Sequence, residues 1–114
     1  MESVVALMDA ALAAEHCQLY ARGADKTGGE RVVYNFNTTW YNGGRREARM
    51  KLQIYAPTMA RGLELETLLD GLLVKKGDRA LTPSCTACTR NGGGWLEDGE
   101  GQIRIAYYDL IFRK

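Results

Sequence analysis

Hydrophobic and polar residues alternate strictly over residues 47–56, and this is the clearest pattern in the chain. Because successive side chains of a strand point to opposite faces, a period of two predicts a strand with one buried and one solvated face. Such strands are typical of antiparallel sheets that helices cover on one side only. The apolar members are Ala48, Met50, Leu52, Ile54 and Ala56, and the polar members are Glu47, Arg49, Lys51 and Gln53.

Apolar residues at helical spacing predict two helices. An alanine-rich segment predicts a helix over residues 3–21, with Ser3 as its N-cap and Gly23 as its stop. A leucine stripe predicts a second helix, which Thr58 caps and Gly77 follows. The first stripe contains Val4, Val5, Met8, Leu12 and Leu19, and the second contains Leu65, Leu68, Leu69, Leu72 and Leu73.

A hairpin is predicted after each helix. The predicted strands are 31–41, 47–56, 80–90 and 102–112, joined within each pair by a tight turn at 42–44 and a glycine-rich loop at 91–101. The last strand is apolar on both faces, so either both faces are covered or a bulge near Ala106 shifts the register. The predicted fold is therefore α+β, in the order α-β-β-α-β-β. It is a four-stranded, mainly antiparallel sheet with two helices packed on one face, in a single domain over residues 1–114.

The composition and net charge of the chain argue against nucleic acids and membranes as binding partners. Lys and Arg number 15 and Asp and Glu number 14, a net charge of +1, so long-range attraction to nucleic acid or to an anionic membrane is weak. The apolar runs are shorter than the roughly 20 residues that span a bilayer. Glu2 stands where a signal peptide would carry basic residues, and three cysteines fit a reducing compartment better than a disulfide framework. We therefore expect a cytoplasmic protein with no nucleic-acid or membrane partner.

Candidate catalytic and metal-binding residues are few. Cys85 and Cys88 form a CxxC pair, but residues three apart in a strand point to opposite faces. His16 and Cys17 would complete four ligands in number, yet neighbours on a helix diverge by about 100°. The run Gly92-Gly93-Gly94 leads into a strand, whereas phosphate loops lead into a helix. The sequence therefore predicts no catalytic residues, no metal, no cofactor and no small-molecule substrate, and a zinc-binding adaptor is an alternative.

Two groups of side chains are candidates for contact with a partner protein. The aromatic and apolar pair in the predicted 91–101 loop either folds back on its own sheet or enters a neighbouring molecule. Three arginines at the first hairpin are either solvated or pair with acidic residues of an adjacent subunit. The predicted interface residues are Arg45, Arg46, Arg49, Trp95, Leu96 and, on the last strand, Tyr107.

In the order of its elements and the residue pattern of its strands, the chain resembles the tail-terminator and minor-capsid, or head–tail joining, proteins of long-tailed bacteriophages and prophages. The resemblance covers nearly the whole chain. It rests on the strands Val32-Val33-Tyr34-Asn35-Phe36 and Arg49-Met50-Lys51-Leu52-Gln53-Ile54-Tyr55-Ala56, the helix opening Pro57-Thr58-Met59-Ala60, and the final strand within residues 101–110.

This resemblance implies an α/β fold with a mixed or antiparallel sheet and a structural role without catalysis. It implies a ring of identical subunits, commonly a hexamer, that caps the growing tail tube and joins it to the head. Its partners would be copies of itself and tail-tube or neck proteins, in the bacterial host cytoplasm during assembly and then in the virion tail or neck.

A small-ligand-binding or regulatory domain is the alternative function. Its ligand would lie in a pocket beneath residues 91–101, lined by Trp95 and by Tyr107 or Tyr108.

Overall fold

The computed structural model describes residues 2–23, 30–42, 45–74, 81–98 and 101–113, which form an α+β fold. The elements are α1 (Glu2–Ala14), β1 (Gln18–Ala21), β2 (Arg31–Asn42), β3 (Arg45–Tyr55), α2 (Met59–Leu73), β4 (Cys85–Asp98) and β5 (Gly101–Arg113). The strands form one five-stranded sheet in the order β1-β2-β3-β5-β4, in which β1 is parallel to β2 and the other neighbours are antiparallel. Neither described helix is long and apolar enough to cross a membrane.

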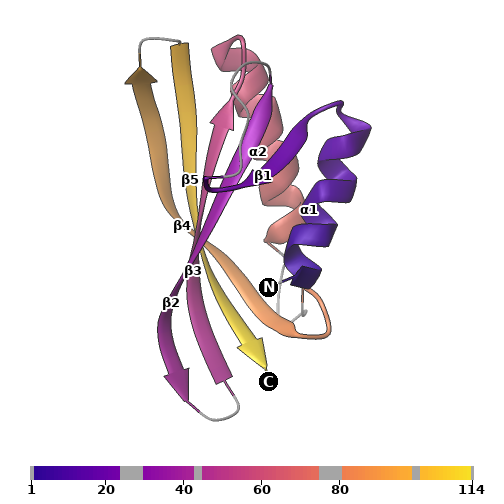
Figure 1. Ribbon diagram of the computed structural model, residues 1–114, viewed down its shortest axis with the longest axis vertical. Coiled ribbons are helices and arrows are strands. Elements are labelled where there is room, and N and C mark those ends of the chain that lie inside the picture. The colour runs from indigo at the N-terminus through magenta and orange to yellow at the C-terminus, as the bar shows by residue number, and fades with distance from the viewer. Residues whose placement is uncertain (1, 24–29, 43–44, 75–80, 99–100, 114) are drawn as a thin grey trace.

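Both helices lie on the same side of the sheet, and the described residues place no helix on the other side (Figure 1). The predicted alternation in β3 is confirmed, because its even-numbered apolar residues are at most 1% exposed and face the helices. Burying each of the larger ones, Met50, Leu52 and Ile54, contributes about 1.5–3 kcal/mol. The core that they form includes Val4, Met8 and Leu12 of α1, Ala48, Met50, Leu52 and Ile54 of β3, and Leu65, Leu69 and Leu73 of α2.

The sheet has five strands and not the predicted four, because α1 ends seven residues before the predicted end at residue 21. His16 takes a positive φ of 57°, which ends the helix. The Cys17 N–H donates to the Leu12 carbonyl at 3.0 Å and the His16 N–H donates to the Ala13 carbonyl at 3.1 Å. These two bonds are those of a Schellman motif, with histidine where glycine is usual. The chain then enters β1, so Leu19 packs from a strand and not from the predicted helix.

The predicted 91–101 loop is wrong over residues 91–98, which continue β4 in antiparallel pairing with β5. The glycines that suggested a loop instead form a bulge between Arg90 and Gly93. Gly93 has a φ of 155°, and a Cβ there would collide with the Ile105 carbonyl oxygen. The predicted strand at 80–90 begins only at Cys85, because residues 82–85 form a turn. In this turn the Cys85 N–H donates a hydrogen bond to the Thr82 carbonyl.

The alternative of a bulge near Ala106 is also wrong, because β5 pairs with β3 without a shift from Ile103 to Arg113. The last strand therefore has two apolar faces: Tyr108 and Leu110 are buried beneath the helices, and Ile105 and Tyr107 lie on the side without helices.

The predicted cap of α2 is confirmed, because the Thr58 side chain accepts the Arg61 N–H at 3.1 Å. The predicted leucine stripe needs correction at Leu68, which is 36% exposed. The buried stripe contains Gly62, Leu65, Glu66, Leu69 and Leu73. The Gly77 stop and the centre of the 42–44 turn lie outside the described residues.

The left-handed residue His16 gives a test of how α1 ends. A non-glycine residue in this conformation costs about 1–2 kcal/mol, so His16→Gly should raise the free energy of unfolding by about 1 kcal/mol in urea denaturation. Ala13→Gly, at an exposed position in the last turn of α1, is the matched control and should lower it by about 1 kcal/mol. If both variants were destabilised equally, the histidine would not be strained in this turn.

Candidate functional site

The predicted interface residues divide between the two faces of the sheet. Arg49 and Tyr107 lie on the side without helices, where directly paired residues of β3 and β5 share a face. Arg45 lies on the same side and donates to the Glu47 carboxylate at 3.1 Å, whereas Arg46 is exposed in register with Phe112 of the helix side. Trp95 lies on the helix side. The side chain of Leu96 is outside the described part of the structure.

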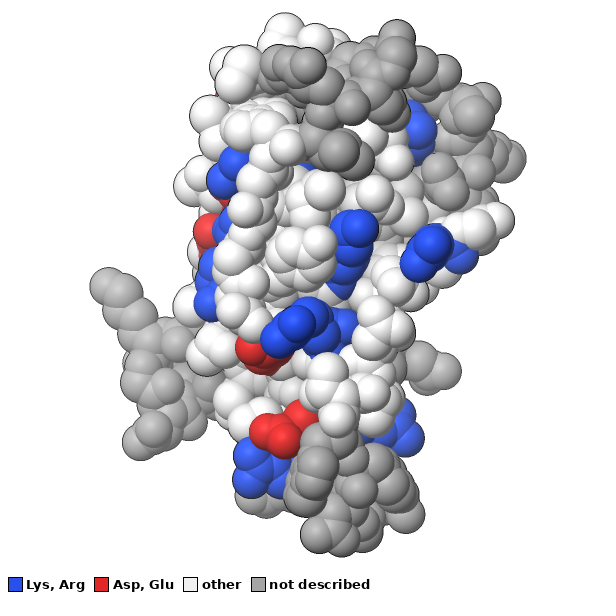
Figure 2. All heavy atoms as spheres, turned by 90° about the vertical axis from the view of Figure 1, so that its left-hand side faces the viewer, with Lys and Arg blue, Asp and Glu red and all other residues white. Residues whose placement is uncertain are grey.

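The side of the sheet without helices, called the open face below, carries charged side chains spread among uncharged ones (Figure 2). Arg49 donates to Asp109 at 3.1 Å, and the Asn91 amide donates to the same carboxylate at 2.7 Å. The Arg31 guanidinium lies 3.9 Å from the centre of the Tyr55 ring. The described residues of this face on β3 and β5 are Arg45, Glu47, Arg49, Lys51, Gln53, Tyr55, Ile103, Ile105, Tyr107, Asp109 and Ile111.

Trp95 folds back on its own molecule, which was one of its two predicted positions. Its ring lies over α2, with an indole carbon 3.2 Å from where a Cβ on Gly62 would stand. The Arg104 guanidinium lies 5.1 Å from the ring centre, within the range of a cation–π contact. Gly62 therefore makes room for the indole, which explains a glycine in the first turn of α2.

A network of charged side chains beside Trp95 joins α2 to the second hairpin. Glu66, only 8% exposed, accepts from Arg90 at 2.9 Å and from Arg104 at 2.6 Å. Arg90 also donates to both oxygens of Asp70 at 2.9 Å, and the Tyr108 hydroxyl donates to Asp70. Burial and the Asp70 carboxylate raise the pKa of Tyr108. The sequence reasoning missed this network, although a glutamate inside the buried stripe of α2 was a signal for it.

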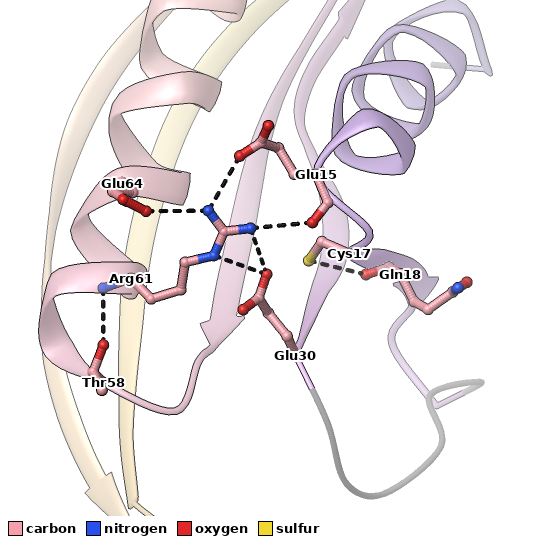
Figure 3. Close-up of polar contacts among 7 residues, drawn as sticks. All are labelled: Glu15, Cys17, Gln18, Glu30, Thr58, Arg61 and Glu64. Atoms are coloured by element: carbon pink, nitrogen blue, oxygen red, sulfur yellow. Dashed lines mark hydrogen bonds and ion pairs between the residues drawn. The ribbon is translucent and has the colours of Figure 1, made fainter.

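A second cluster gathers around Arg61 at the start of α2 (Figure 3). Its guanidinium donates to Glu30 at 2.8 and 3.0 Å, and to Glu15 and Glu64 at 3.1 Å. It also donates to the Glu15 carbonyl at 3.1 Å, in the turn that ends α1. The hydrogen bonds that Arg61 donates to Glu30 and Glu15 raise its pKa. One arginine thus ties α2, the end of α1 and the start of β2 together.

The cysteines lie in the core, and the predicted opposite orientation of Cys85 and Cys88 is wrong. A bulge between Cys85 and Ala87 adds a residue to β4, so both thiols face the helices and are buried. Burial raises the pKa of Cys88 to about 12 and, with a contribution from Glu30, that of Cys17 to about 11. Within the described residues, no group of three or more His, Cys, Asp or Glu side chains could hold a metal ion.

A scan against protein-family models and a search of curated proteins found no match to the chain. Both charged clusters consist of side chains that satisfy one another and hold elements together. On the open face, Arg45 and Arg49 pair with Glu47 and Asp109, and the partly exposed apolar residues Ile105, Tyr107 and Ile111 lie among these ion pairs.

The network around Glu66 can be tested against the cluster around Arg61 on the same helix. Glu66→Gln removes the charge that two partly buried arginines share, and hydrogen bonds to charged groups contribute about 1.5–3 kcal/mol each. We expect its free energy of unfolding to fall by about 2–3 kcal/mol in urea denaturation. Glu64→Gln is the control: this side chain is 63% exposed, and its loss should cost less than about 1 kcal/mol. Equal effects would show that the buried network contributes no more than a surface pair.

The buried thiols predict a loss of stability in alkali. Cys17 and Cys88 hold their protons in the folded state up to about pH 11 and 12, whereas the unfolded chain releases them from about pH 9. Their contribution is therefore complete below pH 9 and falls as the pH rises through that window. In urea denaturation from about pH 8 to about pH 11, the Cys17→Ala/Cys88→Ala variant should lose stability less steeply than the wild type. Parallel slopes for the two proteins would contradict this assignment.

Proposed function

We propose that this chain is a structural protein of a long-tailed phage or prophage, a tail-terminator or head–tail joining protein. Copies of the chain assemble into a ring, commonly a hexamer in proteins of this kind, at the end of the tail. The ring contacts tail-tube or neck proteins. The protein works in the bacterial host cytoplasm during assembly and afterwards in the virion tail or neck.

The observation that carries the proposal is the one-sided sheet. In an isolated domain, the sheet face away from the helices is expected to be polar along each strand. Here β5 places Ile105, Tyr107 and Ile111, each partly exposed, on the open face, whereas Ile103 and Val33 on the same side are buried within the molecule. Apolar residues on a face without helices are typical of surfaces that meet another protein.

The shape of the molecule supports the same function. Figure 1 shows the β2–β3 and β4–β5 hairpins pointing in opposite directions, with the β2–β3 hairpin extending beyond the helices, and the molecule measures 43 × 24 × 22 Å. An elongated subunit offers separate surfaces to two neighbours, which a closed ring requires. The two charged clusters support a structural role as well, since their side chains already satisfy one another.

The ligand-binding alternative gains no support from this geometry. Its pocket was placed beneath a loop at 91–101, but residues 91–98 form a strand. Trp95 covers Gly62 of α2, and Tyr107 and Tyr108 lie on opposite faces of β5. The zinc adaptor gains none either, because Cys85 and Cys88 are buried in the core.

The ring predicts a concentration-dependent oligomer. Light scattering of the purified chain over a wide concentration range should show a discrete oligomer, and negative-stain images of the same sample should show rings with a central hole. A ring forms from identical contacts, so one mass should dominate at high concentration. A mass that stays monomeric at the highest attainable concentration, in a sample without rings, would contradict the proposal.

A further inference from the structure

The outer face of α2 is unusually apolar for a helix on a protein surface. Within the described part of the chain, the exposed large hydrophobic side chains all lie on it or at its C-cap: Met59 at 48%, Leu63 at 43%, Leu68 at 36% and Val74 at 37%. A helix that packs on a sheet is normally charged on its other side. Glu64 is the one charged residue among the exposed positions from Met59 to Val74. The exposed positions are Met59, Ala60, Leu63, Glu64, Thr67, Leu68, Gly71 and Val74.

This outer face is hollowed and acidic. A shallow groove of about 700 Å³ runs along it, lined by Ala60, Leu63, Glu64, Thr67 and Leu68 with Glu15 at one end. Both charged residues of the groove belong to the cluster around Arg61. That cluster has three carboxylates and one guanidinium, a net charge of −2. The groove therefore fits an apolar surface with basic groups at its margin.

The open face of the sheet has the opposite charge. Among the described residues of β2, β3 and β5, it carries four cations and two carboxylates, a net charge of +2. Figure 2 shows these basic side chains spread between uncharged ones. The cations are Arg45, Arg49 and Lys51, which are at least partly exposed, and Arg31, which is buried, and the carboxylates are Glu47 and Asp109. Lys51 lies in register with Tyr107 and beside Ile105, so positive charge and apolar area are adjacent.

We propose that the outer face of α2 docks on the open face of a second copy of this chain. The helix would cover the neighbour's sheet as it covers its own, with the acidic groove against Arg49 and Lys51. Charge complementarity selects this arrangement over packing α2 against α2, which would bring two clusters of charge −2 together. The inference rests on the proposed ring, for which it names the two surfaces in contact.

The two surfaces lie on opposite sides of the molecule, since α2 presents its other side to the sheet. Each copy can therefore use α2 toward one neighbour and the open face toward the next. Such a head-to-tail contact generates a ring where the rotation closes and a filament where it does not. A contact between like surfaces would stop at a dimer.

A mixing experiment tests this contact with the full chain. Leu63→Glu places a charge in the apolar groove, and Lys51→Glu reverses the charge of the open face. Each variant alone should self-associate at least about tenfold more weakly than the wild type in sedimentation and light scattering. Mixed in equal amounts, the two should form a 1:1 dimer, because each supplies the surface that the other lacks. Ala10→Glu, on the exposed side of α1, is the control and should assemble like the wild type.

Circular dichroism and thermal unfolding of each variant check that it is folded. Wild-type rings with both variants assembling normally would overturn the inference while leaving the proposed function intact. Loss of assembly in Leu63→Glu alone, without dimers on mixing, would indicate a contact between two α2 helices and would also overturn it. A wild-type protein that stays monomeric and binds a DNA oligonucleotide through Lys51 would overturn both proposals.

Discussion

The position in which α2 packs on β3 and β5 determines the rest of the structure. Leu65, Leu69 and Leu73 supply the buried apolar area, but apolar contacts tolerate a helix that slides or rotates. Glu66 removes this freedom, because its carboxylate must meet Arg90 of β4 and Arg104 of β5 at the same time. Buried ion pairs give little net stability after desolvation, yet they penalise every arrangement that leaves one charge without its partner. The network therefore fixes where the helix sits, and the leucines hold it there.

Fixing α2 also decides which surfaces are left over. Once Gly62, Glu66 and the leucines face the sheet, Leu63 and Leu68 are forced outward. Tyr108 and Leu110 lie on the side of the sheet that the helices cover. The apolar residues at the odd-numbered positions of β5 therefore lie on the open face. The two apolar surfaces thus arise from one packing choice, which is why they lie on opposite sides of the molecule.

The sequence predicted what depends on local periodicity and missed what depends on distant partners. The alternation of β3 and the Thr58 cap are local, so both were predicted correctly. The early end of α1 depends on His16 in a conformation that glycine usually occupies, so the residue types in this segment did not indicate where the helix ends. The extension of β4 through three glycines depends on pairing with β5. The position of the Trp95 ring depends on the space left by Gly62, 33 positions earlier in the sequence. Of the predicted interface residues, Arg49 and Tyr107 share the open face, whereas Trp95 serves the fold.

The edges of the sheet argue for association through faces. An exposed edge strand invites pairing with another chain unless it is short, bulged or otherwise irregular. At one edge, β1 has only four residues and pairs with β2 over residues 31–34, so beyond it the edge is β2 itself, which is bulged between Thr38 and Trp40. At the other, β4 is bulged twice, between Cys85 and Ala87 and between Arg90 and Gly93, so its outer hydrogen-bonding groups cannot form a regular ladder. Extending the sheet from copy to copy is therefore disfavoured at both ends. For the proposed ring this favours contact between faces, in which a helix lying on a neighbour's sheet would repeat the packing found within each molecule.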